Sequence, residues 1–234
     1  GGCANVLNNI YALGGKVYGA GVVGADEVGE RLLDELRERD ISGEGIVVES
    51  KRPTTIKTRV IAHSQQIVRF DRESRQPIQR KSIEKIIEYI NGMRADLGAI
   101  VISDYNKGII NSNLMSKLKS LNIPILVDPK KENFEFYKDV FLIKPNSVEA
   151  REMAKKDNDL EAAKTLTKIL NSNILLTRAS EGIAYFGLNG DFFNYSSQPI
   201  GELKDVTGAG DSVIAAFAHF YNSLIPQKYL YPAM

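Results

Sequence analysis

The sequence contains one cysteine, two histidines and no tryptophan, which rules out several kinds of site. Cys3 cannot form a disulfide within the chain and fits a reducing cytosol, so we expect a cytoplasmic protein. His63 and His219 lie far apart in the sequence, and no zinc-binding spacing exists. No apolar run approaches the roughly 18 residues of a membrane span. Lysine plus arginine (30) nearly balance aspartate plus glutamate (29), which indicates neither a nucleic-acid nor a membrane partner.

The 234 residues are enough for one large domain, and a composition of 43% hydrophobic and 25% charged residues is typical of a globular protein. Short β-branched runs alternate with amphipathic stretches, which predicts an α/β fold with a mostly parallel sheet and helices on both faces. The expected helices are 25–39, 81–93, 111–121, 147–155, 160–170 and 211–222. The expected strands are 16–23, 45–48, 99–102, 124–127, 140–143, 174–176, 182–186 and 192–195. We expect a single domain over residues 1–234.

Residues 54–71 break this rhythm, because they alternate with period two on either side of a turn at 63–66, as a hairpin does. The alternation places Lys57 and Arg59 on one face of the first strand, and Arg69 on a face of the second. If those faces coincide, the hairpin is a lid with several cations, which suit a phosphate group. The alternative is a solvated hairpin edge protected by its charges.

The segment Asp205-Val-Thr-Gly-Ala-Gly-Asp211 precedes an apolar helix. The small residues Gly208, Ala209 and Gly210 let the backbone bend sharply and approach a ligand closely. Free N–H groups at the start of the helix, together with the helix dipole, then favour an anion such as a transferring phosphoryl group. Asp211 beside that anion is a candidate general base for an attacking hydroxyl. The alternative is an ordinary helix start with Asp211 as its N-cap.

Further polar residues follow predicted strands, at the edge where parallel sheets bind ligands. Lys130 comes after Asp128-Pro129 at the end of one strand, and Asp104 occupies an equivalent loop. Asn146 and Glu149 lie where a strand passes into a helix, although a carboxylate is favoured there by the helix dipole in any case. For Lys130 and Asp104, the alternative is a loop residue without a role.

Two other nucleotide-binding patterns bear on the class of protein. Gly19-Ala-Gly21-Val-Val-Gly24 fits the G-x-G-x-x-G pattern between a strand and a helix, and Glu49 ends the next strand, as in an NAD site. An NAD site leaves the glycine turn before Asp211 unexplained. The sequence has no G-x-x-x-x-G-K-[ST], which disfavours a P-loop kinase.

The segment Asp205–Asp211 resembles the signature of the ribokinase-like (PfkB) carbohydrate kinase family. Other segments resemble that family in the same order, and the resemblance runs from residue 1 to about 224: Gly1-Gly2-x-x-Asn5, Val23-Gly24-x-Asp26-x-x-Gly29, Pro145-Asn-Ser-Val-Glu149 and Leu176-Thr-Arg-Ala-Ser-Glu-Gly182. The resemblance implies a ribokinase-like fold with a β-hairpin lid, a sugar kinase that uses ATP and Mg²⁺, and a homodimer formed through the lid.

The family resemblance also implies roles for individual residues. It places the catalytic base at Asp211, with the amides of Gly208, Ala209 and Gly210 around the transferring group. Glu149 is implied to support Mg²⁺ through water. The residues implied to contact ATP are Asn146, Ser147, Glu149, Thr177, Arg178, Gly182, Asp205 and Thr207. The residues expected to contact the sugar or its phosphate are Gly1, Gly2, Asn5, Lys57, Arg59, Arg69, Asp104 and Lys130.

A closer resemblance, to the bacterial heptose 7-phosphate kinases of lipopolysaccharide core synthesis, rests on segments 53–63, 65–72, 103–108 and 127–130. It implies phosphorylation of O1 of D-glycero-D-manno-heptose 7-phosphate. Relatives usually have a strand before the Gly-Gly signature and further elements after the final helix, so we expect a kinase domain truncated at both ends. A kinase for another sugar or sugar phosphate, and a truncated non-catalytic homologue, remain alternatives.

Overall fold

The computed structural model describes residues 2–62, 65–197 and 208–224. The chain divides into two compact units, which are described separately here. The sheet unit comprises residues 1–16, 95–105 and 118–234, and the hairpin unit comprises residues 17–94 and 106–117.

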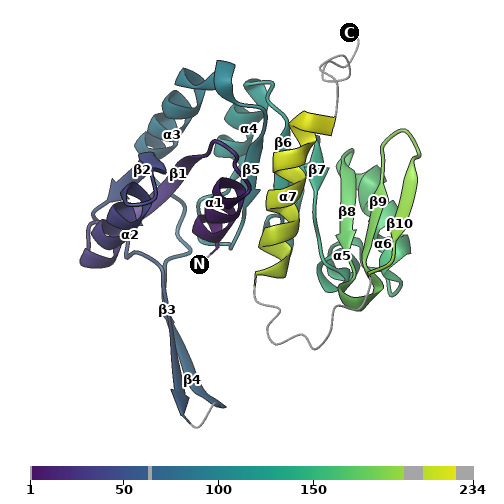
Figure 1. Ribbon diagram of the computed structural model, residues 1–234, viewed down its shortest axis with the longest axis horizontal. Helices are drawn as coiled ribbons and strands as arrows, with labels where there is room; N and C mark the ends of the chain where they lie inside the picture. The colour runs from purple at the N-terminus through teal and green to yellow at the C-terminus, as the bar shows by residue number, and fades with distance from the viewer. Residues whose placement is uncertain (1, 63–64, 198–207, 225–234) are drawn as a thin grey trace. The chain divides into compact units, whose positions relative to one another are not determined.

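The sheet unit is built on a six-stranded sheet with the order β10-β9-β8-β7-β6-β5 (Figure 1). Its strands are β5 (Ile100–Ser103), β6 (Ile125–Asp128), β7 (Leu142–Ile143), β8 (Asn173–Thr177), β9 (Ile183–Phe186) and β10 (Phe192–Tyr195). The first four pair in parallel, and β9 and β10 add antiparallel strands beyond β8. The four parallel strands therefore end at one common edge.

Helices cover both faces of this sheet (Figure 1). On one face, α7 (Ala209–Leu224) packs against α1 (Cys3–Ala12) and over β5 and β6. On the other, α5 (Ser147–Ala154) and α6 (Asp159–Leu170) pack against each other and against β8. A 3₁₀ helix, Lys131–Tyr137, follows β6, and shorter ones span Arg94–Asp96 and Ala179–Glu181. Among the described residues, no helix is both long and apolar enough to cross a membrane.

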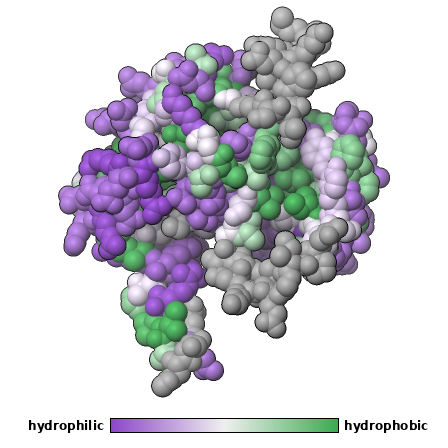
Figure 2. Space-filling model, in the orientation of Figure 1, coloured by the Kyte–Doolittle hydropathy of each residue, from purple (hydrophilic) through white to green (hydrophobic). Residues whose placement is uncertain are grey.

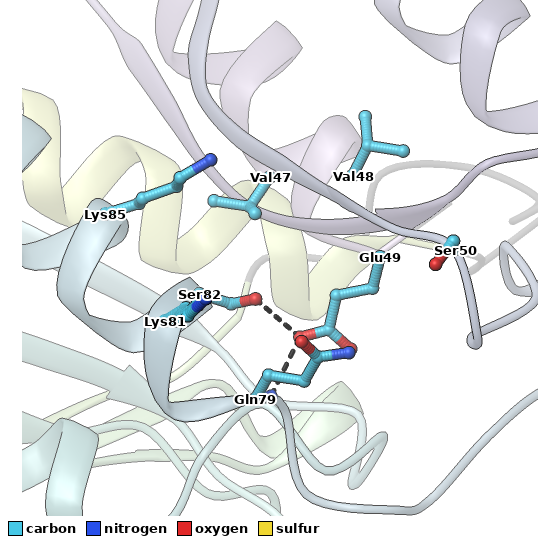
Figure 3. Close-up of a pocket in the computed structure, with 8 residues that line it drawn as sticks. All are labelled: Val47, Val48, Glu49, Ser50, Gln79, Lys81, Ser82 and Lys85. Carbon is cyan, nitrogen blue, oxygen red and sulfur yellow. Dashed lines mark hydrogen bonds between the residues drawn. The ribbon is translucent and has the colours of Figure 1, made fainter.

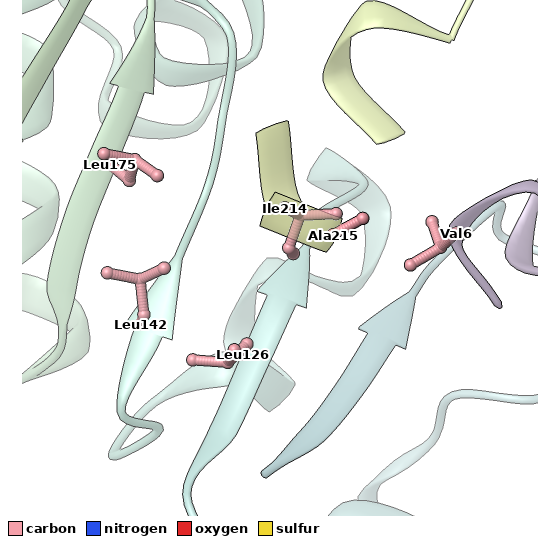
Figure 4. Packing of buried hydrophobic residues seen from close by; sticks show 6 residues of the cluster. All are labelled: Val6, Leu126, Leu142, Leu175, Ile214 and Ala215. Atoms are coloured by element: carbon pink, nitrogen blue, oxygen red, sulfur yellow. The ribbon is translucent and has the colours of Figure 1, made fainter. Parts of the chain in front are cut away.

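The core beneath α7 fixes where the start of that helix lies. Side chains from β6, β7 and β8 pack against side chains from α1 and α7 in one cluster (Figure 4): Val6, Leu126, Leu142, Leu175, Ile214 and Ala215. Each valine, leucine or isoleucine side chain of this kind contributes roughly 1.5–3 kcal/mol when it is fully buried. Because Ile214 and Ala215 are in the first two turns of α7, this packing anchors the amino-terminal end of the helix on the sheet.

The hairpin unit contains a two-stranded parallel sheet of β1 (Tyr18–Gly24) and β2 (Ser42–Glu49). The helices α2 (Glu27–Arg37) and α3 (Arg80–Gly92) pack on this sheet. The antiparallel hairpin of β3 (Ile56–Ala62) and β4 (Gln65–Arg72) extends away from them (Figure 1). The helix α4 (Ser112–Ser120) follows later in the chain.

Asp26 joins two parts of the hairpin unit. Its carboxylate caps α2 by accepting from the Gly29 amide at 3.0 Å, and it accepts from the Thr54 amide, also at 3.0 Å. Arg72, the last residue of β4, pairs with the same carboxylate. The start of α2 and both ends of the hairpin are therefore linked through one side chain.

The α/β class and every predicted strand and helix are confirmed, with ends that differ by a few residues. The prediction missed α1, because the glycines that flank it and its polar residues obscure the apolar stripe of Val6 and Ile10. Strand pairing also differs from a single sheet, since β1 and β2 pair with each other in a sheet of their own. The sequence pattern indicates which segments are extended but not which of them pair.

Candidate active site

Polar side chains gather where the parallel strands of the sheet unit end. Tyr105 follows β5, Asp128 ends β6 and Lys144 follows β7. The strand register places Ser103 beside Asp128, and Val127 beside Ile143, so these ends lie next to one another. This is the edge at which α/β sheets bind ligands.

The turn before α7 has the geometry of an anion cradle. The Ser212 amide donates to the Gly208 carbonyl at 2.9 Å, so the preceding amides of Ala209, Gly210 and Asp211 have no acceptor within the helix. Gly208 has a φ of +81°, and a Cβ there would lie 2.9 Å from the Asn5 side-chain nitrogen. Glycine therefore leaves open a space that any other residue would fill, beside the first-turn N–H groups of α7 and the positive end of the helix dipole.

Asp211 is the third residue of α7 rather than its N-cap, and its carboxylate is held by two donors. The Asn5 amide donates to Oδ2 at 2.8 Å, and the Tyr105 hydroxyl donates to Oδ1 at 3.3 Å. Burial, followed by the charges of Asp211 and Asp128, raises the pKa of Tyr105 to about 12, so its hydroxyl stays protonated. The carboxylate is 8% exposed and fixed in orientation, as a general base requires.

Two lysine–carboxylate pairs lie at the same strand ends. Lys144 contacts Asp128 at 3.0 Å, and Lys130 contacts Glu149 at 2.6 Å. Burial raises the pKa of Asp128; Lys144 opposes that shift, while the charges of Glu149 and Asp211 add to it. Three carboxylates and two ammonium groups therefore interact in this part of the sheet unit.

Glu149 is also part of the start of α5. The Asn146 side chain caps the helix by accepting from the Glu149 backbone N–H at 2.9 Å. The Glu149 carboxylate in turn accepts from the Asn146 backbone N–H at 3.1 Å. The described residues contain no cluster of three or more metal-ligating side chains. Mg²⁺ commonly takes one or two carboxylates and keeps several waters, so the oxygens of Glu149 and Asp128 fit a magnesium ion that is bound largely through water and phosphate.

Several predicted ligands have partners within the protein. Asp104 is buried, and its carboxylate accepts from the Asn133 amide at 2.6 Å and from the Tyr137 hydroxyl. These bonds tie the end of β5 to the 3₁₀ helix after β6. Gly2 has a φ of +53°, and a Cβ there would lie 2.9 Å from the Tyr105 ring, so its small size permits that contact.

The predicted nucleotide ligands around β8 stabilise their own loop. Ser147 donates to Asp159 at 2.7 Å, and Arg178 donates to the same carboxylate at 3.1 Å while also pairing with Glu181. The Thr177 hydroxyl lies 3.4 Å from the Pro145 carbonyl. A Cβ on Gly182 would lie 1.9 Å from the Tyr195 carbonyl, so the close approach that this glycine permits is to β10. Gly1, Asp205 and Thr207 lie outside the described residues.

The hairpin places its charges on one face, as its sequence predicted. Lys57 lies opposite Asp71 and Arg59 opposite Arg69, so the charged faces of the two strands coincide. Burial and the nearby charges of Arg69 and Lys107 lower the pKa of Lys57. Asp71 compensates in part, through an ion pair with Arg69 at 2.6 Å. The charged face of the hairpin is therefore a cluster of the cations Lys57, Arg59 and Arg69, and Asp71 offsets part of their charge.

The hairpin unit also has a shallow pocket of about 170 Å³ between β2 and α3 (Figure 3). Within it, the Glu49 carboxylate accepts from the Ser82 hydroxyl at 2.6 Å and from the Gln79 amide at 2.8 Å. None of the predicted site residues lines this pocket: its lining is Val47, Val48, Glu49, Ser50, Gln79, Lys81, Ser82 and Lys85. The contacts of Glu49 tie β2 to α3.

Sequence reasoning did not assign three of the residues that the structure brings to the strand ends. The sequence predicted Asp104, after β5, as a site residue, whereas it is the hydroxyl of its neighbour Tyr105 that donates to Asp211. Asp128 was noted only as the residue before Pro129, and Lys144 followed a run interpreted as a buried strand. The available signal was position, since each of the three ends a parallel strand or follows it within two residues.

Comparison with known proteins identifies the class. The pfkB family carbohydrate kinase profile matches residues 1–223, and this chain belongs to that family of sugar kinases. Among curated proteins, the bifunctional protein HldE of Sulfurimonas denitrificans is 40% identical over 228 residues, which are 93% of this chain and 47% of the relative. HldE of Wolinella succinogenes is 36% identical over 229 residues, which are 94% of this chain and 48% of the relative. The chain thus spans about half the length of these relatives.

Solved structures confirm the fold. The tetrameric inhibited form of phosphofructokinase-2 from Escherichia coli matches with a TM-score of 0.77 at 19% identity, over 98% of this chain and 78% of that one. The same enzyme in complex with fructose-6-phosphate matches with a TM-score of 0.75, also at 19% identity, with the same coverage. At this identity the likeness shows a ribokinase-like fold and leaves the substrate open.

Proposed function

We propose that this chain transfers the γ-phosphate of ATP to the anomeric O1 of D-glycero-D-manno-heptose 7-phosphate, in the cytoplasmic synthesis of lipopolysaccharide core heptose. Membership of the pfkB family supports sugar phosphorylation, and the relatives named HldE support the heptose substrate. The observation that carries the chemistry is the Asp211 carboxylate, fixed by Asn5 and Tyr105 in the first turn of α7.

In this reaction Asp211 accepts the proton of the O1 hydroxyl as that oxygen attacks the γ-phosphorus. The new O1–phosphorus bond forms while the bond between the γ-phosphorus and its bridging oxygen breaks, and ADP leaves with that electron pair. The amides of Ala209, Gly210 and Asp211 donate to the oxygens of the transferring group, with Gly208 leaving the space that it occupies. Asn5 and Tyr105 keep the carboxylate aimed at the hydroxyl.

ATP would be held at the ends of the parallel strands, with Asn146, Ser147, Thr177, Arg178 and Gly182 forming the loops around it. Mg²⁺ would neutralise phosphate charge there, with Glu149 supporting its water shell. The same carboxylate is paired with Lys130, and its oxygens would face the water shell of the ion.

The substrate's 7-phosphate is assigned to the charged face of the hairpin, with Lys57, Arg59 and Arg69 as its ligands. Support comes from the register that places these cations on one face, and from the lowered pKa of Lys57 beside Arg69 and Lys107. A phosphate relieves that repulsion, whereas a neutral sugar does not. We assign four further residues to the sugar or to the loops that position it. Gly2 and Asn5 lie at the start of α1, and Asp104 and Lys130 lie just beyond the ends of parallel strands.

The other face of the hairpin supports a homodimer. Thr58 and Val60 lie opposite Phe70 and Val68, and the side chains of Val60, Val68 and Phe70 are exposed. Figure 2 shows an apolar patch on the hairpin. Phe70 is 58% exposed and Val68 is 47% exposed. An amphipathic hairpin with an uncovered apolar face is stabilised by pairing with a second copy, so we assign the dimer contact to this face.

The test is ADP release with Mg²⁺–ATP and a panel of heptose 7-phosphate, fructose 6-phosphate and ribose. Turnover per KM is expected to be highest for heptose 7-phosphate, and phosphorus NMR should show a new anomeric phosphate. Equal or better turnover of fructose 6-phosphate assigns the chain to another sugar phosphate in the same family. No turnover of any sugar, in a protein that still unfolds cooperatively, contradicts the proposed activity and favours a non-catalytic homologue.

A further inference from the structure

Lys144 is a buried cation to which the reaction described above gives no role. It follows β7 directly, and its amide donates to the Val127 carbonyl at 2.8 Å, which fixes its backbone at the ends of the parallel strands. The residue is 2% exposed, and lysine is rarely buried to this degree unless it is paired. A buried ammonium at a ligand-binding edge needs a physical reason.

The Lys144 ammonium lies against the turn that begins α7. A Cβ built on Gly210 would lie 3.2 Å from Nζ, so the amine reaches the second residue of the helix, and a larger residue would crowd it. This is the positive end of the helix dipole, where a cation is unfavourable and an anion is favourable. The same three amides that point into the turn add to that positive potential.

Asp128 compensates part of this charge, since its Oδ1 lies 3.0 Å from Nζ. An ammonium has three donors, however, and one carboxylate oxygen does not satisfy all three. The Lys144 ammonium and the first-turn amides of α7 therefore lie at the same helix end. An anion placed there is bonded by both, as the phosphate-binding lysine and backbone amides are in other phosphoryl-transfer sites.

We propose that Lys144 is a catalytic residue that binds the transferring γ-phosphoryl group, and that Asp128 holds its ammonium in place until the nucleotide arrives. This inference rests on the proposed function, because it takes the turn before Asp211 as the place of phosphoryl transfer. Lys144 takes no proton in the reaction. Its charge offsets the negative charge on the phosphoryl oxygens as O1 attacks and ADP departs.

The competing explanation is structural: Lys144 exists to neutralise the partly buried Asp128. The two explanations separate in a paired substitution. Lys144→Met leaves the partly buried Asp128 without its partner, so both explanations expect lost stability and lost activity. Lys144→Met combined with Asp128→Asn removes the stranded charge, and its melting temperature should recover toward that of the wild type. Lys168→Met, on the exposed surface of α6, is the matched control for the loss of one lysine.

The measurements are kcat with heptose 7-phosphate and the affinities for ATP and ADP by titration calorimetry. Because Asp128 is also a candidate magnesium ligand, the reference is Asp128→Asn alone, and we expect the paired variant to stay roughly 10²–10³-fold below it in kcat, the usual effect of removing one donor to a transition-state oxygen. It should lose ATP affinity and keep ADP affinity, since ADP lacks the transferred group. A kcat in the paired variant equal to that of Asp128→Asn overturns the proposal, as does equal loss of ATP and ADP affinity.

Two further arms keep the result interpretable. If Lys144→Met does not fold, Lys144→Gln retains a hydrogen-bond donor for Asp128 and should show the same selective loss of ATP affinity; unchanged ATP affinity in a folded Lys144→Gln overturns the proposal. The ATP–ADP comparison uses no sugar. A wild type that phosphorylates no sugar therefore contradicts the proposed function alone, and Lys144 is still tested by the nucleotide affinities.

Discussion

Replacing Gly208 with alanine tests the geometry of the glycine turn, because this position combines two separable effects. Its φ of +81° is strained for any residue with a Cβ, which costs roughly 1–2 kcal/mol. For a chain of this size such a loss lowers the melting temperature by about 2–8 °C. The added methyl carbon would also lie 2.9 Å from the Asn5 nitrogen that donates to Asp211.

The second effect is on catalysis. Displacing the Asn5 amide weakens a hydrogen bond to a charged group, which is worth roughly 1.5–3 kcal/mol, or about 10- to 150-fold in kcat. Gly14→Ala is the matched control, since Gly14 has a φ of +86° with nothing within 4 Å of its Cβ position. Calorimetric melting and ADP release on both variants measure the two effects. Equal kcat in Gly208→Ala and Gly14→Ala would refute the proposed geometry of the turn.

Three further predictions follow from individual contacts. Tyr105→Phe removes the hydroxyl that donates to Asp211 and should lower kcat roughly tenfold at unchanged ATP affinity, measured by steady-state kinetics and calorimetry; an unchanged kcat contradicts an orienting role. Lys57→Ala should raise KM for a phosphorylated sugar and leave KM for ATP unchanged, and a parallel rise in both argues against a phosphate clamp. Hydrogen bonds from Thr54, and then Gly29 and Arg72, lower the pKa of Asp26 to about 2. The stabilisation from Asp26 is therefore complete above its unfolded pKa of roughly 3.9 and is lost as the pH falls toward 2. Asp26→Asn should melt below wild type at pH 7, and the gap should close by pH 2; a gap independent of pH contradicts this.

Much of the fold was predictable because local patterns determine it. Alternation with period two placed Lys57 and Arg59 on one face of β3, and the register opposite Asp71 and Arg69 confirmed that the two charged faces coincide. The separate pairing of β1 with β2 was not predictable, since nothing in a strand's own residues names its neighbour. The helix α1 was missed for a related reason: its stability comes from packing on α7 more than from its own sequence.

The site was predictable to the level of strand ends and not to the level of side-chain direction. Asp104 and Tyr105 are neighbours after β5, yet Asp104 turns toward Asn133 and Tyr137 while Tyr105 reaches Asp211. Which of these two side chains faces α7 depends on the path of the chain as it leaves β5, and the sequence pattern does not specify that path. Lys144 was not predicted because the position before Pro145 follows an apolar run. Its proposed role depends on its closeness to Gly210, which is distant in sequence.

Replacement of Asp211 by asparagine tests the central claim most directly, because it keeps the shape of the side chain and removes the base. Turnover of heptose 7-phosphate should fall roughly 10²- to 10⁴-fold, the usual contribution of a general base. Affinities for Mg²⁺–ATP and for the sugar phosphate, measured by titration calorimetry, should stay within a few-fold of wild type. Near-normal turnover in Asp211→Asn would contradict the assignment of the catalytic base and, with it, the proposed mechanism.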